Sequence, residues 1–209
     1  MKRNYQLETD GVIKSLCGNR PKLLLQCCCG PCSSYVLEYL TKHFDVTVLY
    51  YNPNIQPQAE YEKRLFFMRL VASKYPETVS VMECEYRGED FLGAVRGLEN
   101  EPEGGARCTK CFELRLRETA RLAKKGAFDY FCTTLSVSPH KDEQRLNEIG
   151  FSLEREFEVK WLPSDFKKRE GYKRSNELTG EYGLYRQNYC GCLYSLAEAE
   201  KSLVPDCTG

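Results

Sequence analysis

The stretch LLLQCCCGPCSS, residues 23–34, places four cysteines in six positions directly after a run of leucines. The apolar run predicts a short buried strand over 22–28, because a proline and a Gly-Pro pair bound it and it is too short for a helix. The two serines that close the stretch are candidate N-caps for a helix over 35–43. Strand character resumes at residue 45, so the cysteines are predicted to lie at a strand end within a β-α-β unit.

Alternating helices and strands continue along the chain. Two further helix and strand pairs follow, over 60–75 and 78–86 and then over 108–126 and 128–137. This alternation predicts an α/β fold with a doubly wound, mostly parallel sheet. In such sheets a ligand binds beyond the carboxyl ends of the strands, which is where the cysteine-rich turn should lie.

The chain of 209 residues has the length of one compact domain with a full core. We expect a single catalytic domain over 1–209, with its α/β core at 20–150. The polar and aromatic segment 151–195 is predicted to form mostly helices and loops that cover the active site. Residues 203–209 are predicted to be a frayed tail.

Composition restricts the functions to consider. Lysine and arginine together number 30, as do aspartate and glutamate, so an anionic partner would have to meet a local patch. The N-terminus lacks the apolar core of a signal peptide, and a run of about 18 apolar residues is absent, so we expect a cytoplasmic protein without a membrane partner. In a reducing cytosol, the 12 cysteines indicate metal ligands or redox catalysts rather than a disulfide framework.

Three cysteine groups stand out. They are Cys27, Cys28, Cys29 and Cys32 at the strand end, Cys108 and Cys111 in RCTKCF, and Cys190 and Cys192 in YCGCLYS. A C-x-x-C pair at a helix start directs two thiolates to one point, and the helix dipole favours their ionised form. With two thiolates from the strand-end turn it can complete a closed site. Structural zinc, an iron-sulfur cluster and a thiol pair all remain open.

The other cysteines need separate interpretations. A disulfide between Cys190 and Cys192 would close a very small ring, and such a strained bond is oxidising and labile. Four scattered cysteines are predicted to be small buried hydrophobic side chains, namely Cys17, Cys84, Cys132 and Cys207.

Several motifs occur in order between Leu23 and Ser195. They are CCCGPCSS, YYNPNIQPQAEYEKR, RCTKCFELRL, DYFCTTLSVSPHK, DFKKREGYKRS and YRQNYCGCLYS. Together they resemble the QueH family of epoxyqueuosine reductases. The resemblance implies a metalloenzyme that reduces the cyclopentane epoxide of epoxyqueuosine to an alkene, with loss of water, at the wobble base of a tRNA anticodon stem-loop. It also implies a PP-loop or HUP architecture, as in adenine-nucleotide hydrolases, in which CCCGPCSS replaces the phosphate loop. ATP use is therefore not implied.

The resemblance extends to site residues. It implies that a 4Fe-4S cluster is held by Cys28, Cys29, Cys108 and Cys111. The family's C-x-C motif matches Cys190 and Cys192. The register of CCGPC leaves Cys27 on the buried side of the strand.

The implied reaction consumes two electrons and two protons, whereas one 4Fe-4S cluster delivers one electron at a time. A second redox element is therefore expected. It is either the dithiol of Cys190 and Cys192, or a second iron that acts as a Lewis acid and is held by this pair and Cys32 together with a carboxylate. Asp165 in SDFKKREGY is a candidate ligand or proton donor, with a helix N-cap as the alternative. The sequence does not identify the electron donor.

Substrate contacts are expected in the late polar segment. DFKKREGYKR combines aromatic side chains for stacking on unpaired bases with an excess of basic residues, namely Lys167, Lys168, Arg169, Lys173 and Arg174. A merely solvated charged face is the alternative. Arg186 and Gln187 lie next to the C-x-C pair and are expected to face the modified base.

Two other functions stay open. A zinc-binding module without enzymatic activity would use four thiolates but leaves the C-x-C pair unexplained. A cluster-dependent tRNA thiolation enzyme would need a nucleotide-binding loop, and the sequence has no recognisable one.

Overall fold

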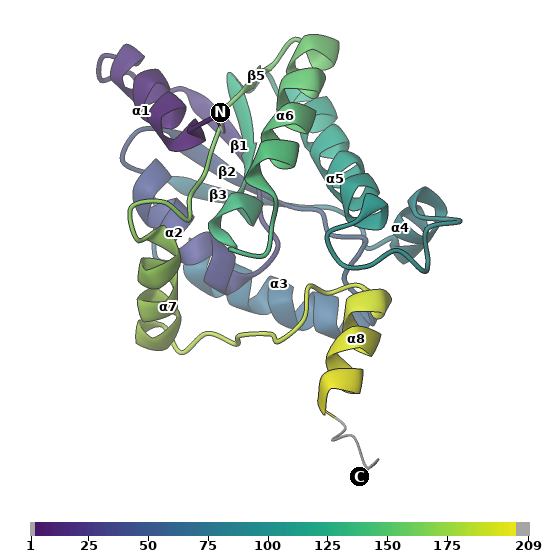
Figure 1. Cartoon of the computed structure of the whole chain (residues 1–209). Coiled ribbons are helices and arrows are strands. Elements are labelled where there is room, and N and C mark those ends of the chain that lie inside the picture. Colours follow the sequence, from purple (N-terminus) through teal and green to yellow (C-terminus); the bar gives the residue numbers. More distant parts are fainter. Residues whose placement is uncertain (1–2, 204–209) are drawn as a thin grey trace.

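The computed structural model describes residues 3–203. Within them, five strands form one sheet in the order β3-β2-β1-β4-β5, and every neighbouring pair is parallel (Figure 1). The strands are β1 (Lys22–Gln26), β2 (Asp45–Tyr50), β3 (Val79–Glu83), β4 (Tyr130–Thr133) and β5 (Lys160–Trp161). The predicted α/β fold with a doubly wound parallel sheet is confirmed.

Helices flank the sheet on both faces. The helices of the described chain are α1 (Tyr5–Ser15), α2 (Gly30–Leu40), α3 (Gln58–Ala72), α4 (Gly88–Ala94), α5 (Ala106–Lys125), the 3-10 helix η1 (Thr134–Val137), α6 (Glu143–Phe157), α7 (Gly171–Glu181) and α8 (Leu193–Leu203). α2 packs against α3, and α5 packs against α6 (Figure 1). Because β-α-β crossovers are right-handed, the first pair covers one face of the sheet and the second pair covers the other. No helix within the described chain has the length and apolar character needed to cross a membrane.

The leucine run forms the centre of the sheet. Leu24 of β1 pairs with Thr47 of β2 on one side and with Phe131 of β4 on the other. The three leucines Leu23–Leu25 are fully buried because helices cover both faces of the strand. This burial explains why β1 has a continuous apolar run rather than an alternating pattern.

The helix after the cysteines begins earlier than predicted. α2 starts at Gly30 with Cys29 as its N-cap and Pro31 in its first turn, so the N-cap interpretation of Ser33 and Ser34 was wrong. Proline favours this position because its fixed φ suits the first turn, where no backbone donor is needed. The two serine hydroxyls instead donate to the carbonyls of Cys29 and Pro31, at 2.7 and 2.9 Å.

The strand predicted over 128–137 is shorter in the structure. β4 ends at Thr133, whose hydroxyl accepts a hydrogen bond from the Leu135 amide at 3.2 Å and starts η1. The helices α1 and α4 and the two-residue strand β5 were not predicted. After β5 the chain forms α7, which packs on α2, and then extends past α3 to α8 (Figure 1). The predicted tail lies outside the described residues from 204 onward.

The turn after β1 lies where the sheet reverses its winding. β1 connects through α2 to β2 on one side, whereas β4 connects through α6 to β5 on the other. The crevice outside the carboxyl ends of two such strands is the usual ligand site of an open α/β sheet. The cysteine turn and η1 both lie at this point.

Candidate active site

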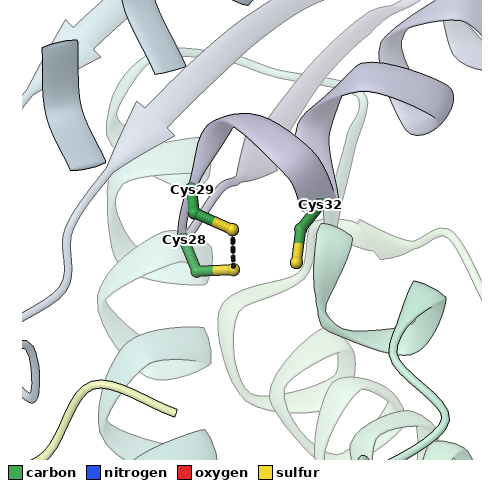
Figure 2. A group of neighbouring side chains, drawn as sticks. All are labelled: Cys28, Cys29 and Cys32. Atoms are coloured by element: carbon green, nitrogen blue, oxygen red, sulfur yellow. Dashed lines mark hydrogen bonds between the residues drawn. The ribbon is translucent and has the colours of Figure 1, made fainter. Parts of the chain in front are cut away.

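Three cysteine sulfurs converge at the carboxyl end of β1. The Sγ atoms of Cys28, Cys29 and Cys32 all lie within 4.8 Å of one another, and those of Cys28 and Cys29 are 3.7 Å apart (Figure 2). Cys29 is the extended N-cap residue of α2 and Cys32 lies in its first turn, so the start of the helix brings both sulfurs to Cys28. Such a group of thiols suits a thiophilic metal.

Cys27 is not part of this group. Its side chain is fully buried in the core, as expected, and burial raises the pKa of its thiol. Its carbonyl oxygen accepts a hydrogen bond of 2.8 Å from Asn52 Nδ2. Cys27 therefore helps to fix the backbone of the turn.

The three grouped thiols do not ionise alike. Hydrogen bonds from the two neighbouring thiols lower the pKa of Cys28 well below its ordinary value. Arg115 and Arg64 act in the same direction, while burial opposes them. The interaction with Cys28 in turn raises the pKa values of Cys29 and Cys32. The group therefore favours one thiolate, which is the form of cysteine that binds metal.

A second cysteine group lies where α5 begins. Cys108 and Cys111 occupy its first turns, and Cys190 lies close enough to influence both thiols. Burial is the main cause of the raised pKa values of both thiols, and it raises the pKa of Cys111 to about 12. Cys111 and Cys192 share a small buried cluster with two apolar residues from the α4 region. The structure therefore places the C-x-x-C pair beside the C-x-C pair.

Arg115 lies close to both cysteine groups. Its charge interacts with Cys28 of the first group and with Cys111 and Cys190 of the second. Within the described residues, the group whose sulfurs lie within 4.8 Å of one another includes neither Cys108 nor Cys111. The predicted ligand set takes Cys28 and Cys29 from the first group and Cys108 and Cys111 from the second. A cluster of several irons can bridge such a set, because its ligands lie farther apart than those of a single ion.

A cavity of about 670 Å³ opens beside these cysteines. Cys28, Cys32 and Cys190 all line it, so both cysteine groups reach the same space. The remaining wall comes from the loop before α5, from Arg115, from η1 and the loop after it, from α7 and from residues 186–190. We call this space the central cavity. The late segment thus supplies one wall of the site.

The C-x-C loop is anchored from α3. Arg64 Nη1 donates a hydrogen bond of 2.9 Å to the Cys190 carbonyl oxygen, and the Gln56 amide donates one of 2.8 Å to the Gly191 carbonyl oxygen. Gly191 has a φ of +129°, a conformation that other residues rarely adopt, and a Cβ there would lie 2.9 Å from Arg64 Nη1. The loop therefore depends on glycine at this position.

The two cysteines of this loop have different surroundings. Cys190 is half-buried on the cavity wall, whereas Cys192 is buried and its Sγ accepts a hydrogen bond of 3.4 Å from the Ser195 amide. Cys190 also lies beside Lys141, whose Nζ pairs with Glu103 Oε1 at 2.9 Å. Burial opposes the charge of Lys141, but Cys190 and Glu103 raise its pKa overall. Cys190 therefore faces the cavity with a fixed cation beside it.

Sequence reasoning did not single out Lys141 or Arg115. Lys141 is the last residue of the quoted motif DYFCTTLSVSPHK. Arg115 follows Cys111 by four residues, so Cys111 and Arg115 lie on the same face of α5. The sequence signal that could have identified Arg115 was a charged residue four positions after the second cysteine of a C-x-x-C pair.

Arg186 and Gln187 both line the central cavity. Gln187 Nε2 donates a hydrogen bond of 3.2 Å to Cys29 Sγ. Arg186 donates to the Tyr172 hydroxyl at 2.7 Å and to Asn176 Oδ1, and its guanidinium lies over the Tyr172 ring. The pair therefore joins the cysteine turn to a polar and aromatic wall.

Asp165 lies away from the cavity wall. Its side chain is buried, and its Oδ1 is 2.9 Å from Lys167 Nζ, which also contacts Glu143 Oε2 at 2.6 Å. It is not among the residues that line the central cavity. Asp165 instead holds Lys167 in a partly buried charge cluster.

The basic segment is largely paired with carboxylates. Its ion pairs join Lys167 to Glu143 and Asp165, Arg169 to Asp10, Lys173 to Glu170, and Arg174 to Glu38, Glu177 and Glu181. Lys168 is exposed and forms no ion pair within the described chain. The positive excess seen in the sequence is thus mostly compensated in the folded protein.

The scattered cysteines differ from one another. Cys132 is buried as predicted and Cys84 is partly buried, but Cys17 is exposed, so its prediction as a buried side chain was wrong. Cys17 follows the C-cap of α1 with a φ of +50°, at a surface turn where the chain reverses. Cys207 lies outside the described residues. All eleven cysteines within residues 3–203 are free thiols, so the C-x-C pair is not a disulfide in this structure.

Comparisons with known proteins agree on one family. The family model described as epoxyqueuosine reductase QueH matches residues 23–198. The chain is 42% identical to a protein of that name from Streptococcus pyogenes serotype M1, over 93% of this chain and 80% of the relative. It is 40% identical to one from Staphylococcus epidermidis, over 92% and 86%, and 37% identical to one from Thermotoga maritima, over 84% and 91%. The chain therefore belongs to the QueH family of epoxyqueuosine reductases.

Proposed function

We propose that this enzyme reduces the epoxide of epoxyqueuosine at the wobble position of a tRNA to give queuosine. The observation that carries the proposal is the central cavity, in which the sulfurs of Cys28, Cys32 and Cys190 meet a wall of polar and aromatic side chains. The names of the relatives supply the substrate, and the cavity supplies a place where thiol or metal chemistry can meet it.

The donor atoms fit an iron-sulfur cluster. Cys28 and Cys29 contribute sulfurs from a preformed turn with a readily ionised thiol, and Cys108 and Cys111 contribute two more from the start of α5. We infer that these four cysteines hold a 4Fe-4S cluster, which supplies single electrons when bound. The positive charges of Arg115 and Arg64 suit an anionic centre at this place.

The C-x-C pair is the proposed second redox element. Reduction of the epoxide to an alkene and water takes two electrons and two protons, so a second element must supply or store one electron. Cys190 faces the cavity and Cys192 lies behind it, an arrangement that suits a dithiol relay. The alternative is that this pair and Cys32 hold a second iron. Either version places Cys190 on the cavity wall that the substrate would meet.

The wall of the cavity also offers groups for protons and for the base. Lys141 keeps its ammonium beside Cys190, where it can donate a hydrogen bond to the epoxide oxygen as the carbon-oxygen bond breaks. Asp165 was our candidate for this part, and its place beside Lys167 suits an indirect role. Arg186 and Gln187 can hydrogen-bond the modified base while Tyr172 stacks on it.

The proposed partner is the anticodon stem-loop that bears epoxyqueuosine. Lys168 is the best placed cation of the basic segment for a phosphate contact, because its charge is not already paired within the described chain. The proposal places the enzyme in the cytosol, where free thiols persist and an electron donor of unknown identity must reach the site.

The test is an anaerobic assay combined with metal analysis. Purified protein with a chemical reductant should convert epoxyqueuosine in tRNA to queuosine, seen by mass spectrometry as the loss of one oxygen atom from the nucleoside. The same preparation should be brown and contain iron and acid-labile sulfide. Zinc without sulfide, together with an unchanged nucleoside, would contradict the proposal. Transfer RNA that already carries queuosine serves as the control.

A further inference from the structure

Three arginine side chains are almost completely buried in the described chain, namely Arg64, Arg107 and Arg115. A buried charge is costly unless an opposite charge or a full set of hydrogen bonds compensates it. Arg64 pairs with Glu60 at 2.6 Å. Arg107 donates to two backbone carbonyl oxygens and lies 3.6 Å from Glu198. Both therefore have a carboxylate nearby.

Arg115 differs because no carboxylate within the described residues pairs with it. Its Nη2 donates to Asn52 Oδ1 at 2.8 Å and to Gln26 Oε1 at 3.3 Å, and both acceptors are neutral amides. Its Nε is buried and has no hydrogen-bond acceptor. Arg115 lines the same cavity as Cys28 and Cys190, and the thiols of Cys28, Cys111 and Cys190 lie close enough to interact with its charge. The cysteine site is therefore the place where this guanidinium can find a counter-charge.

The position of Arg115 is fixed from two directions. Gln26 Oε1 also accepts a hydrogen bond of 2.8 Å from Thr133 Oγ1, so the carboxyl ends of β1 and β4 hold this acceptor. Asn52 bonds the Cys27 carbonyl and so ties the same network to the cysteine turn. On α5, Arg115 follows Cys111 by four residues and shares its face of the helix. The network therefore holds one cation against both cysteine groups.

We propose that Arg115 is the built-in counter-cation of the anionic metal centre and raises its reduction potential. The inference rests on the proposed iron-sulfur cluster. A fixed positive charge stabilises the more negative, reduced state of a centre more than its oxidised state, and the effect is large in a buried site. Arg115 also offers its unbonded Nε to a sulfur or thiolate in the cavity wall.

The experiment compares the wild type with Arg115→Gln, Arg115→Lys and Arg117→Gln. Gln keeps a donor for Asn52 without the charge, and Lys keeps the charge without the planar fork. Arg117 lies on the same helix but is exposed and paired with Glu156, so it is the matched control. The readouts are iron and sulfide per chain and the midpoint potential from an anaerobic spectroscopic titration. We expect a lower midpoint for Arg115→Gln, a midpoint near the wild-type value for Arg115→Lys, and no shift for Arg117→Gln.

The outcomes separate this inference from the proposed function. A wild-type protein without iron and sulfide would overturn both. A loaded wild type whose midpoint is the same in Arg115→Gln would overturn only the role of Arg115. If Arg115→Gln fails to take up iron, Arg115→Lys decides: uptake restored by lysine supports the counter-cation, whereas failure of both variants overturns it in favour of a purely structural guanidinium.

Discussion

Cys28, Cys29 and Cys32 are neighbours in the sequence, whereas Cys108, Cys111, Cys190 and Cys192 come from α5 and from the loop before α8. The first group is shaped by one turn and the start of one helix, and its backbone is tied to the sheet by Asn52 and Gln26. In the second group, the start of α5 places Cys108 and Cys111, whereas the loop of Cys190 and Cys192 depends on tertiary contacts, above all on Arg64 from α3. The proposed cluster ligands are therefore placed by local structure and the C-x-C pair by assembly.

This difference suggests a division of labour. The proposed metal centre draws two ligands from the turn after β1 and two from the start of α5, and both places are set by nearby regular structure. A loop that is pinned by a few distant hydrogen bonds can change its cysteine chemistry without disturbing that centre.

The largest effect should follow loss of a cluster ligand. Single Ser replacements of Cys28, Cys29, Cys108 and Cys111 should each abolish the visible absorption and most of the iron and sulfide, because a serine oxygen is a poor ligand for this centre. Cys17→Ser is the control, since that thiol is exposed at the end of α1. A replacement that keeps full iron and sulfide would remove that residue from the ligand set and bring in Cys32 or Cys27.

A strong but selective effect should follow Gly191→Ala. The new Cβ would lie 2.9 Å from Arg64 Nη1 and 3.1 Å from Ile55 Cγ1, so the C-x-C loop must shift. We expect turnover to fall by roughly tenfold to a hundredfold through misplacement of Cys190, with the iron content unchanged.

Gly183→Ala is the matched control for this change. Gly183 also has a positive φ, of +60°, but a Cβ there meets nothing within 4 Å. It should cost about 1 kcal/mol of stability with turnover unchanged. Equal turnover in the two alanine variants would show that the loop does not need its observed shape.

A moderate effect on stability should follow Lys167→Gln. The lysine compensates the carboxylates of Asp165 and Glu143, so its loss should lower the free energy of unfolding by about 2 kcal/mol at neutral pH. Burial opposes ionisation of Glu143, but the Lys167 contact lowers its pKa to about 2.

This shift predicts the pH dependence of the same variant. A depressed carboxyl pKa contributes stability that is fully present above the unfolded pKa of about 4.3 and is lost as the pH falls toward 2. Urea unfolding should therefore show a difference in unfolding free energy between wild type and Lys167→Gln. This difference should shrink as the pH falls from about 5 to about 2, the range that spans the unfolded and folded pKa values of Glu143. A difference that stays constant with pH would count against the charge cluster.

The smallest effect is expected for tRNA binding. Lys168→Ala should reduce the slope of log affinity against log salt by roughly one, for one lost phosphate contact. Lys125→Ala is the control, because that exposed lysine lies at the far end of α5 from the cavity. Replacing Lys167 and Arg169 as well should add little, since both already contact carboxylates. If the slope of log affinity against log salt is unchanged in Lys168→Ala, this segment does not contact the tRNA backbone.

Local patterns explain what the sequence could predict. The leucine run and the C-x-x-C helix that was expected to end at residue 126 each depend on neighbouring residues, and both appear in the structure. The early start of α2 was missed because the first-turn proline outweighed the serines. Pairing of the basic segment was missed because Asp10, Glu38 and Glu143 come from distant elements. Arg115 was also missed because its partners, Gln26 and Asn52, are distant in the sequence. Only the folded structure shows that it is buried without a paired carboxylate among the described residues.

The most direct test of the division of labour is a Cys190→Ser and Cys192→Ser double variant. Anaerobic protein should keep its 4Fe-4S absorption and its tRNA affinity while losing epoxide reduction. About one iron fewer per chain would identify a second iron at this pair, and unchanged iron would identify a dithiol relay. Wild-type conversion of epoxyqueuosine by this variant, or loss of its cluster, would contradict the account.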